Sequence, residues 1–181
     1  HARVMREIVQ PAIAGMAKEG TPYVGFLYAG LMIDRKGNPR TLEFNARLGD
    51  PETQPILLRL KSDLLPLLEH ALEGTLDEAA AEWDRRSALC VVRAAANYPE
   101  EPRKGDQITG LPKPGEDCRV FHAGTRLEGR KIVTNGGRVL GVTALGDSLK
   151  RAAQRAYSAV DAIRFDGMQY RKDIAHRALK K

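Results

Sequence analysis

Residues 23–33 read Tyr-Val-Gly-Phe-Leu-Tyr-Ala-Gly-Leu-Met-Ile, an almost uniformly apolar run. Such a run is typical of a strand that is covered on both faces, so it predicts a position inside a layered sheet. Residues 34–39 contain Asp, Gly, Asn and Pro, which are the residue types of a hairpin loop. The chain then returns through residues 40–45, and we expect the two stretches to form an antiparallel pair.

Helical spacing of apolar residues flanks this strand pair on both sides. Residues 4–18 carry one such pattern, and we expect Pro11 to interrupt it because proline lacks the N–H that a helix interior uses. Residues 56–68 carry a second pattern, in which Ser62 or Asp63 is placed to cap the later helix.

The second half of the chain reads differently. We expect strands at four short apolar stretches, namely residues 88–94, 118–125, 131–134 and 138–145. The dipeptide Asn135-Gly136 favours a tight hairpin turn with positive φ between the last two strands. A closing helix is expected after Gly146, with Asp147 or Ser148 as its cap.

These patterns predict an α+β fold in two parts. A helix-backed hairpin is expected in residues 1–80, and a smaller, mostly antiparallel β subdomain with a closing helix in residues 81–181. The composition shift near residues 74–86 is the reason for this boundary.

Composition narrows the functional classes. The chain has 181 residues, and its net charge of +6 comes from 29 basic and 23 acidic residues that are intermixed along it. Intermixed charges are typical of a solvated surface, although a non-catalytic basic binding module stays an alternative. No apolar run has the length of a membrane span, and the first residues lack the pattern of a signal peptide.

The two cysteines, Cys90 and Cys118, fit neither a metal-site spacing nor a disulfide framework. A reducing cytosol is therefore expected, and we interpret Cys90 as an inert core residue within an apolar strand. The chain does not begin with Met, from which we expect a fragment.

The end of the returning strand carries the clearest chemistry. Residues two apart share a face of a strand, so Glu43 and Asn45 project together while Leu42 and Phe44 are expected to point into the core. A carboxylate and an amide oxygen are hard ligands of the kind that Mg²⁺ takes, with further ligands drawn from nucleotide phosphates. Arg47 follows on the same face and can grip a phosphate or carboxylate.

A tight loop follows the strand. Residues 48–55 read Leu-Gly-Asp-Pro-Glu-Thr-Gln-Pro and combine turn residues, two carboxylates and the start of a helix. Backbone N–H groups in such a loop can be aimed at an anion. From these residues alone, a polar strand end that simply meets solvent is the competing interpretation.

Several motifs in order along nearly the whole chain resemble the phosphoribosylamine–glycine ligase (glycinamide ribonucleotide synthetase) family of the ATP-grasp superfamily. The segments that carry the resemblance are residues 25–33, Glu43-Phe44-Asn45-Ala46-Arg47-Leu48-Gly49-Asp50-Pro51-Glu52-Thr53-Gln54, Leu60–Leu64, Phe121-His122-Ala123-Gly124-Thr125, Thr134–Leu140 and Arg171-Lys172-Asp173-Ile174. The Arg-Leu-Gly-Asp-Pro-Glu run is specific to this ligase, whereas Glu-x-Asn alone is shared by ATP-grasp enzymes such as biotin carboxylase or a purine carboxylase, which stay alternatives.

The resemblance implies a carbon–nitrogen ligase of purine biosynthesis. ATP would phosphorylate glycine, and the amine of 5-phosphoribosylamine would attack the glycyl phosphate. Glu43 and Asn45 match the family's Mg²⁺ (or Mn²⁺) ligands. The residues that match the family's substrate-binding loop are Arg47, Gly49, Asp50, Pro51 and Glu52. The resemblance implies catalytic roles for Arg47 and Asp50.

The resemblance also implies what lies outside these residues. Members of the family are more than twice as long, and their glycine-rich phosphate loop precedes the matching segment. We therefore expect the C-terminal part of an ATP-grasp domain plus a small subdomain, with little ligase activity without the N-terminal part. The full-length enzyme is expected to be a cytoplasmic monomer with no nucleic-acid or membrane partner.

Two further residues are candidates for the site. Arg138 belongs, by the resemblance, to the small subdomain and is placed to approach the ribose phosphate as a substrate-binding residue. His122 can be interpreted as an acid–base group, although on an alternating strand a packing or surface role is favoured.

Overall fold

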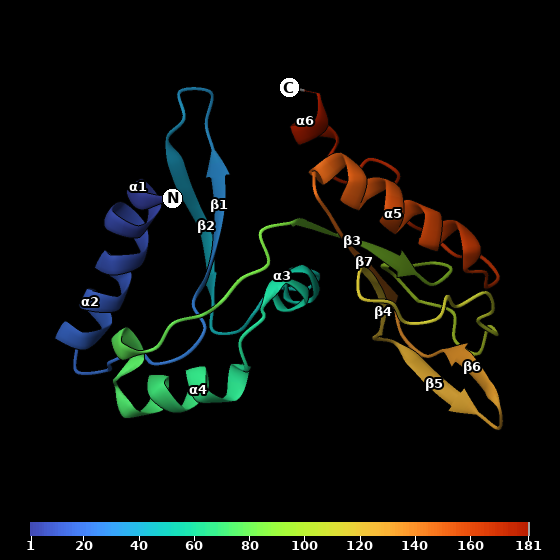
Figure 1. The fold of residues 1–181 in the computed structure, drawn as a ribbon, viewed down its shortest axis with the longest axis horizontal. Helices are drawn as coiled ribbons and strands as arrows, with labels where there is room; N and C mark the ends of the chain where they lie inside the picture. The colour runs from blue at the N-terminus through green and yellow to red at the C-terminus, as the bar shows by residue number, and fades with distance from the viewer. Residues whose placement is uncertain (181) are drawn as a thin grey trace. The chain divides into compact units, whose positions relative to one another are not determined.

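The computed structural model describes residues 1–180 and divides the chain into two compact units (Figure 1). Unit 1 comprises His1–Gly49 and Asp63–Ala80. Unit 2 comprises Asp50–Ser62 and the chain from Ala81 onward. Helices and antiparallel strands occur in both units, as expected for an α+β fold.

The two units differ from the division expected at residue 80 in one segment, residues 50–62, which belongs to unit 2. Its helix α3, Thr53–Arg59, packs against two strands of unit 2, so the segment clusters there. The domain boundaries expected from the sequence, 1–80 and 81–181, remain a prediction.

Unit 1 contains the expected hairpin. Strand β1, Tyr28–Ile33, pairs antiparallel with β2, Pro39–Asn45. In the connecting turn, the Asp34 carboxylate accepts hydrogen bonds of 2.8 Å from the backbone N–H groups of Lys36 and Asn38. This Asx-type turn closes the hairpin because it satisfies backbone donors that have no ladder partner.

The first helix of unit 1 is continuous through Pro11, which corrects the expected interruption. It comprises α1, Ala2–Val4, a π-helical stretch, Met5–Val9, and α2, Gln10–Lys18. Pro11 falls in the first turn of α2, just after the wider π-helical turns. Proline is tolerated there because its ring and missing N–H do not disturb a regular α-helical ladder.

The hairpin is much less buried than its sequence indicates. Leu42 is 65% exposed and Phe44 is 44% exposed, so the expectation that they point into a core is wrong. Met32 and Ile33 are exposed as well, which also corrects the expectation of a strand covered on both faces. The sheet has only two strands, and a bulge between Gly30 and Leu31 disturbs its register.

The remaining helix of unit 1 is α4, Leu64–Glu73, and it begins at one of the two expected caps. Asp63 is the N-cap, and its carboxylate accepts a 3.0 Å hydrogen bond from the backbone N–H of Leu65. Gly74 ends the helix in the left-handed conformation, at φ 75°. A short 3₁₀ turn, Leu76–Glu78, follows.

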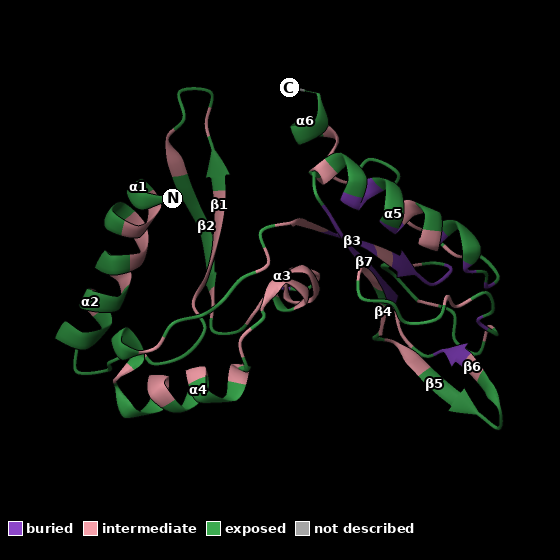
Figure 2. Cartoon of the chain, viewed as in Figure 1, coloured by how far each residue is buried: buried purple, intermediate pink, exposed green. Residues whose placement is uncertain are grey.

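Unit 2 holds the core of the chain. Its three-stranded sheet has the order β3-β7-β4, formed by Ser87–Ala94, Arg138–Gly146 and Cys118–His122. Helix α5, Leu149–Ala162, packs on one face of this sheet, and Ser148 caps it. Figure 2 shows the buried residues gathered on β3, β7 and the inner side of α5.

The opposite face of the sheet is covered only in part. Cys90 and Val92 lie on this face, since they alternate along β3 with Leu89 and Val91, which belong to the core beneath α5. The α3 residue Gln54 lies beside Cys90 at Gly141. Because α3 is short, part of this face stays open, and the pocket described below occupies it.

A second hairpin is formed by β5 (Thr125–Glu128) and β6 (Lys131–Thr134), ahead of the turn at residues 135–138 that the sequence predicts between the last two strands. Strand β6 pairs with β5 rather than with β7, so the expected hairpin at residues 135–138 is wrong. In the turn between β5 and β6, the glycine with positive φ is Gly129, at 60°. Gly136 serves close packing instead, since a Cβ on Gly124 would lie 2.7 Å from the Gly136 Cα.

The chain ends in α6, His176–Leu179. Among the described residues, no helix is long and apolar enough to serve as a membrane span.

Candidate active site

Glu43 and Asn45 lie side by side at the end of β2, as the strand period predicts. The Asn45 amide Nδ2 donates a 3.1 Å hydrogen bond to Glu43 Oε1. Gly30 is the cross-strand partner of Glu43 and makes room for it, since a Cβ there would lie 3.0 Å from Glu43 Cγ. Both polar side chains therefore share one face of the hairpin.

The two oxygen-bearing groups fit a divalent cation in chemistry and position. The Glu43 carboxylate and the Asn45 amide oxygen are hard ligands of the kind that Mg²⁺ takes, and the hydrogen bond between the two side chains shows that they reach the same point. Rotation of the Asn45 amide exchanges its nitrogen and oxygen without moving the strand. Within residues 1–180 no cluster of three His, Cys, Asp or Glu side chains offers a complete metal site, so the pair would need further ligands.

Arg47 and Gly49 follow β2 at the end of unit 1. The Arg47 guanidinium donates a 3.2 Å hydrogen bond to the carbonyl of Leu48, so it folds back on its own loop. Gly49 is buried, unlike every other described residue of this unit. The loop therefore leaves the strand through a tightly packed glycine.

Asp50, Pro51 and Glu52 continue the loop as part of unit 2 and lead directly into α3. Arg138, at the start of β7, holds this segment. Its Nη1 donates a 2.5 Å hydrogen bond to the Asp50 carbonyl and lies 3.3 Å from the Asp50 carboxylate. The structure thus brings together Asp50 and Arg138, two predicted site residues that are 88 positions apart.

Tyr98 completes this contact and was missed in the sequence. Its hydroxyl accepts a 3.1 Å hydrogen bond from Arg138 Nε. This hydrogen bond, followed by the Asp50 carboxylate, raises the pKa of the Arg138 guanidinium. Tyr98 lies in a loop rich in Pro and Gly, 40 residues before Arg138, where no periodic pattern marks it.

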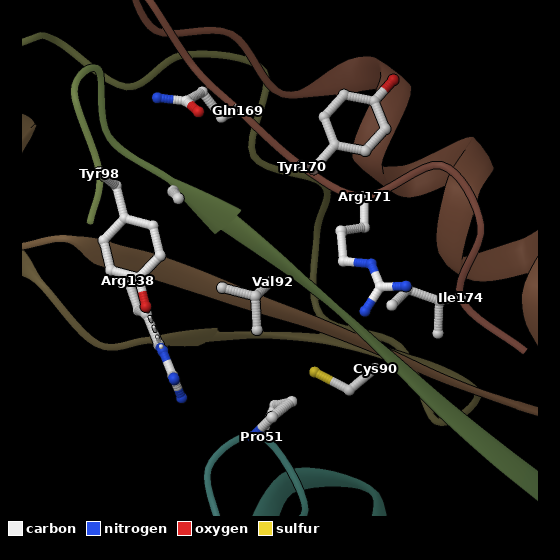
Figure 3. A pocket seen from close by; sticks show the side chains of 10 residues that line it. Pro51, Cys90, Val92, Tyr98, Arg138, Gln169, Tyr170, Arg171 and Ile174 are labelled. Carbon is white, nitrogen blue, oxygen red and sulfur yellow. Dashed lines mark hydrogen bonds between the residues drawn. The ribbon is translucent and has the colours of Figure 1, made fainter.

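A pocket of about 440 Å³ opens beside this contact, on the uncovered face of the sheet (Figure 3). Tyr98 and Arg138 lie at one end, and the Arg171 side chain lies at the other. Cys90 and Val92 project into it from β3. The remaining lining residues are Pro51, Ala94, Gln169, Tyr170 and Ile174.

The pocket combines two guanidinium groups with apolar walls. Arg171 is held by two hydrogen bonds of 2.9 and 2.8 Å to the Asp173 carboxylate, which raise its pKa. Burial raises the pKa of the Cys90 thiol to about 11, so the thiol is protonated near neutral pH. Such a pocket favours an anion with an apolar or sugar-like body over a cation.

His122 lies elsewhere in unit 2. Its ring Nδ1 is 3.1 Å from the Thr125 hydroxyl, and the side chain is exposed at a second pocket formed by residues 111–114 and β4. It does not line the pocket of Arg138. The structure therefore does not bring His122 together with the other predicted site residues of unit 2.

Cys118 lies on the edge strand β4 and is half-buried, and burial raises the pKa of its thiol. It lines the second pocket rather than that of Arg138. The thiols of Cys90 and Cys118 are both free, as the sequence predicts.

Comparison with protein-family models gives two matches in sequence order. The model described as phosphoribosylglycinamide synthetase, ATP-grasp (A) domain, matches residues 1–53. The model described as phosphoribosylglycinamide synthetase, C domain, matches residues 88–177. The two matches lie on either side of α4 and the loop after it.

Curated relatives and solved structures agree with these matches. A phosphoribosylamine–glycine ligase from Ralstonia nicotianae is 60% identical over 181 residues, which are 100% of this chain and 43% of that relative. The crystal structure of phosphoribosylamine–glycine ligase from Thermotoga maritima superposes with a TM-score of 0.82 at 37% identity, over 95% of this chain and 42% of that one. The chain thus spans less than half the length of these relatives.

A more distant likeness concerns the fold alone. Biotin carboxylase from Campylobacter jejuni superposes with a TM-score of 0.61 at 13% identity, over 95% of this chain and 38% of that one. The carboxylase alternative therefore gains a shared architecture from this comparison, and no more.

Proposed function

Because this chain belongs to the phosphoribosylglycinamide synthetase family, we propose that it is the C-terminal portion of an ATP-dependent ligase that joins glycine to 5-phosphoribosylamine. The reaction would proceed through a glycyl phosphate, as one step of purine biosynthesis. The name of these relatives, phosphoribosylamine–glycine ligase, contains this pair of substrates, and the alignment covers the whole of this chain and 43% of each relative.

The observation that carries the proposal is the pairing of Glu43 with Asn45 directly before the Arg47–Glu52 loop. ATP-dependent activation of a carboxylate brings two anions together, so a cation and an arginine must neutralise charge while the reactants are aligned. The pair supplies the cation ligands, and the loop supplies the arginine.

Glu43 and Asn45 would hold a divalent cation, Mg²⁺ or Mn²⁺, bound with ATP. Their hard oxygen atoms and their adjacent positions on β2 fit that role, and nucleotide phosphates would complete the coordination. When bound, the cation neutralises phosphate charge and acts as a Lewis acid. Asn45 contributes an oxygen without adding a second negative charge that would repel ATP.

The loop residues would bind the acceptor substrate. We assign substrate contacts to Arg47, Gly49, Asp50, Pro51 and Glu52, with Arg47 and Asp50 acting at the reacting groups. Arg138 would meet the ribose phosphate, since it lines the anion-favouring pocket and borders the loop through Asp50. A guanidinium suits this role because its donors match the geometry of a phosphate.

The proposal extends to the protein as a whole. The ligase would need residues N-terminal to this chain to grip the ATP phosphates, so these 181 residues alone would show little activity. The full-length enzyme would be a cytoplasmic monomer whose ligands are ATP, glycine and 5-phosphoribosylamine. Nucleic acid and membranes would not be partners.

The test is ADP release that depends on both glycine and 5-phosphoribosylamine, measured with the full-length protein that contains this chain. Glu43→Ala is expected to lower kcat at least a hundredfold and to raise the Mg²⁺ concentration needed for half-maximal rate. The matched control is Glu69→Ala, which removes an exposed carboxylate from α4 of the same unit and should leave the rate within twofold. Wild-type rates for Glu43→Ala would refute the metal assignment.

A further inference from the structure

Arg138 is held at two points that come from different segments of unit 2. Its Nε donates to the Tyr98 hydroxyl at 3.1 Å, and its Nη1 donates to the Asp50 carbonyl at 2.5 Å. Figure 3 shows the Tyr98 side chain directed at the Arg138 side chain at the end of the pocket. Two partners on two nitrogens fix the plane of a guanidinium, whereas one partner leaves it free to swing.

The Tyr98 ring packs directly against Gly137, the residue before Arg138. A Cβ on Gly137 would lie 2.5 Å from Tyr98 Cδ2 and 3.1 Å from Pro102 Cγ, so the ring occupies the space of the missing side chain. The backbone locks the same arrangement, because Ala95 N–H donates to the Gly137 carbonyl at 2.9 Å. Gly137 is required here by close approach, since it is not among the glycines with positive φ.

We propose that Tyr98 is a positioning residue, which orients Arg138 and through it the Asp50 segment of the substrate loop. The inference rests on the proposed function, in which Arg138 and Asp50 contact the acceptor substrate. While Tyr98 engages Nε, Nη1 of Arg138 is directed to the Asp50 carbonyl of the loop. Gly137 takes part as the residue that lets the ring approach.

The physical need for such a residue follows from the exposure of the contact. The Arg138 side chain is 42% exposed and that of Asp50 is 58% exposed, so their ion pair alone is weakened by water. An arginine also has many rotamers to lose when it binds a substrate. A half-buried ring with a hydroxyl acceptor reduces that loss before the substrate arrives.

The first test is Tyr98→Phe in the full-length ligase. This variant keeps the ring against Gly137 and removes only the acceptor for Arg138 Nε. We expect the KM for 5-phosphoribosylamine to rise about three- to tenfold, the size of a partly exposed charged hydrogen bond. The KM values for ATP and glycine should stay within twofold, because the groups that Tyr98 orients contact the acceptor substrate.

The matched control is Ser148→Ala, also in unit 2. The Ser148 hydroxyl accepts a 3.2 Å hydrogen bond from the backbone N–H of Arg151 as the N-cap of α5, and Ser148 does not line the pocket of Arg138. The loss of this cap should lower stability without a selective rise in the KM for 5-phosphoribosylamine. An equal rise in both variants would overturn the proposal.

A double-mutant cycle tests the role of Gly137. Gly137→Ala should raise the same KM at least as much as Tyr98→Phe, because the new Cβ displaces the ring. In a Tyr98→Ala background the ring is gone, so Gly137→Ala should add less than twofold. Additive effects of the two substitutions would overturn the claim that Gly137 acts through Tyr98.

Failure of the proposed function can be distinguished from failure of the positioning role of Tyr98. If the wild-type protein shows no ADP release that depends on glycine and 5-phosphoribosylamine, that function fails while the positioning claim stays testable by ¹⁵N NMR of the Arg138 Nε–H. Its exchange with water should be slowed in wild type and at least several-fold faster in Tyr98→Phe. Equal exchange in the two proteins would overturn the positioning role whatever the activity.

Discussion

Arg93 is the largest of the fully buried side chains, and it carries a charge into the core of unit 2. Its guanidinium Nη2 donates a 2.9 Å hydrogen bond to the carbonyl of Ile163, the C-cap of α5. The guanidinium carbon lies 4.8 Å from the centre of the Tyr170 ring and 5.6 Å from that of Phe165. Burial lowers the pKa of the group.

The net effect of replacing Arg93 follows from opposing contributions. Loss of the hydrogen bond costs about 1.5–3 kcal/mol, and loss of the two ring contacts about 1–2 kcal/mol each. Several kcal/mol are recovered because the cation need no longer be desolvated. The Ile163 carbonyl keeps a second donor, Arg164 Nη1, at 2.8 Å. These polar contributions nearly cancel, so packing decides the result.

Arg93→Ala is therefore expected to destabilise unit 2 by about 2–4 kcal/mol, the cost of a cavity left by a large core side chain. Arg93→Met keeps the volume of the stem and should cost less than half as much. The single tryptophan, Trp83, belongs to unit 2 and reports its unfolding by fluorescence in urea.

With an m-value of about 2 kcal/mol/M, the midpoint for Arg93→Ala should fall by about 1–2 M. A shift below about 0.3 M would refute the packing argument. So would a larger loss for Arg93→Met than for Arg93→Ala, because the buried charge would then be the main stabilising contribution.

Three further predictions concern unit 2. Gly146→Ala would place a Cβ against the backbone of α5, so we expect the free energy of unfolding to fall by at least about 2 kcal/mol in the urea assay. Its control is Gly115→Ala, whose Cβ would have its nearest atom at 3.9 Å and should change the free energy of unfolding by less than about 0.5 kcal/mol. Hydrogen bonds from Arg86 lower the pKa of Asp84 from 3.8 to about 2. The stability that the ionised Asp84 contributes above pH 4 should therefore be lost as the pH falls toward 2, and Asp84→Asn should abolish this contribution to the acid titration of unfolding. Iodoacetamide at pH 7, followed by peptide mass spectrometry, should modify Cys118 well before Cys90, whose pKa of about 11 and burial suppress the thiolate.

Local signals in the sequence predicted local structure well. Asp63 and Gly74 bound α4 as their side-chain and backbone preferences require. The two-residue strand period placed Glu43 beside Asn45, which the 3.1 Å hydrogen bond confirms as a geometric prediction. In each case the deciding interaction spans only a few residues, so the sequence contains it directly.

The errors came where distant segments decide the structure. Strand alternation with Glu43 and Asn45 predicts that Leu42 points into a core, yet burial depends on which layers cover a sheet, and no local pattern specifies them. Asn135-Gly136 was interpreted as a hairpin turn, whereas β6 pairs with β5 and Gly136 packs against Gly124. Tyr98 was missed because its partner, Arg138, is 40 residues away.

The continuous motif from Glu43 to Glu52 is divided between the two units after Gly49. Glu43 and Asn45 are positioned by pairing within the hairpin of unit 1, whereas Asp50 is positioned by Arg138 of unit 2. The proposed cation ligands and the proposed acceptor loop thus depend on different packing, although they adjoin in sequence. Substitutions at Tyr98 should consequently change acceptor binding without changing the Mg²⁺ requirement, since Tyr98 bonds Arg138 within unit 2, whereas Glu43 and Asn45 are paired within the hairpin. A change of both together would mean that the two parts of the motif act as one structural element.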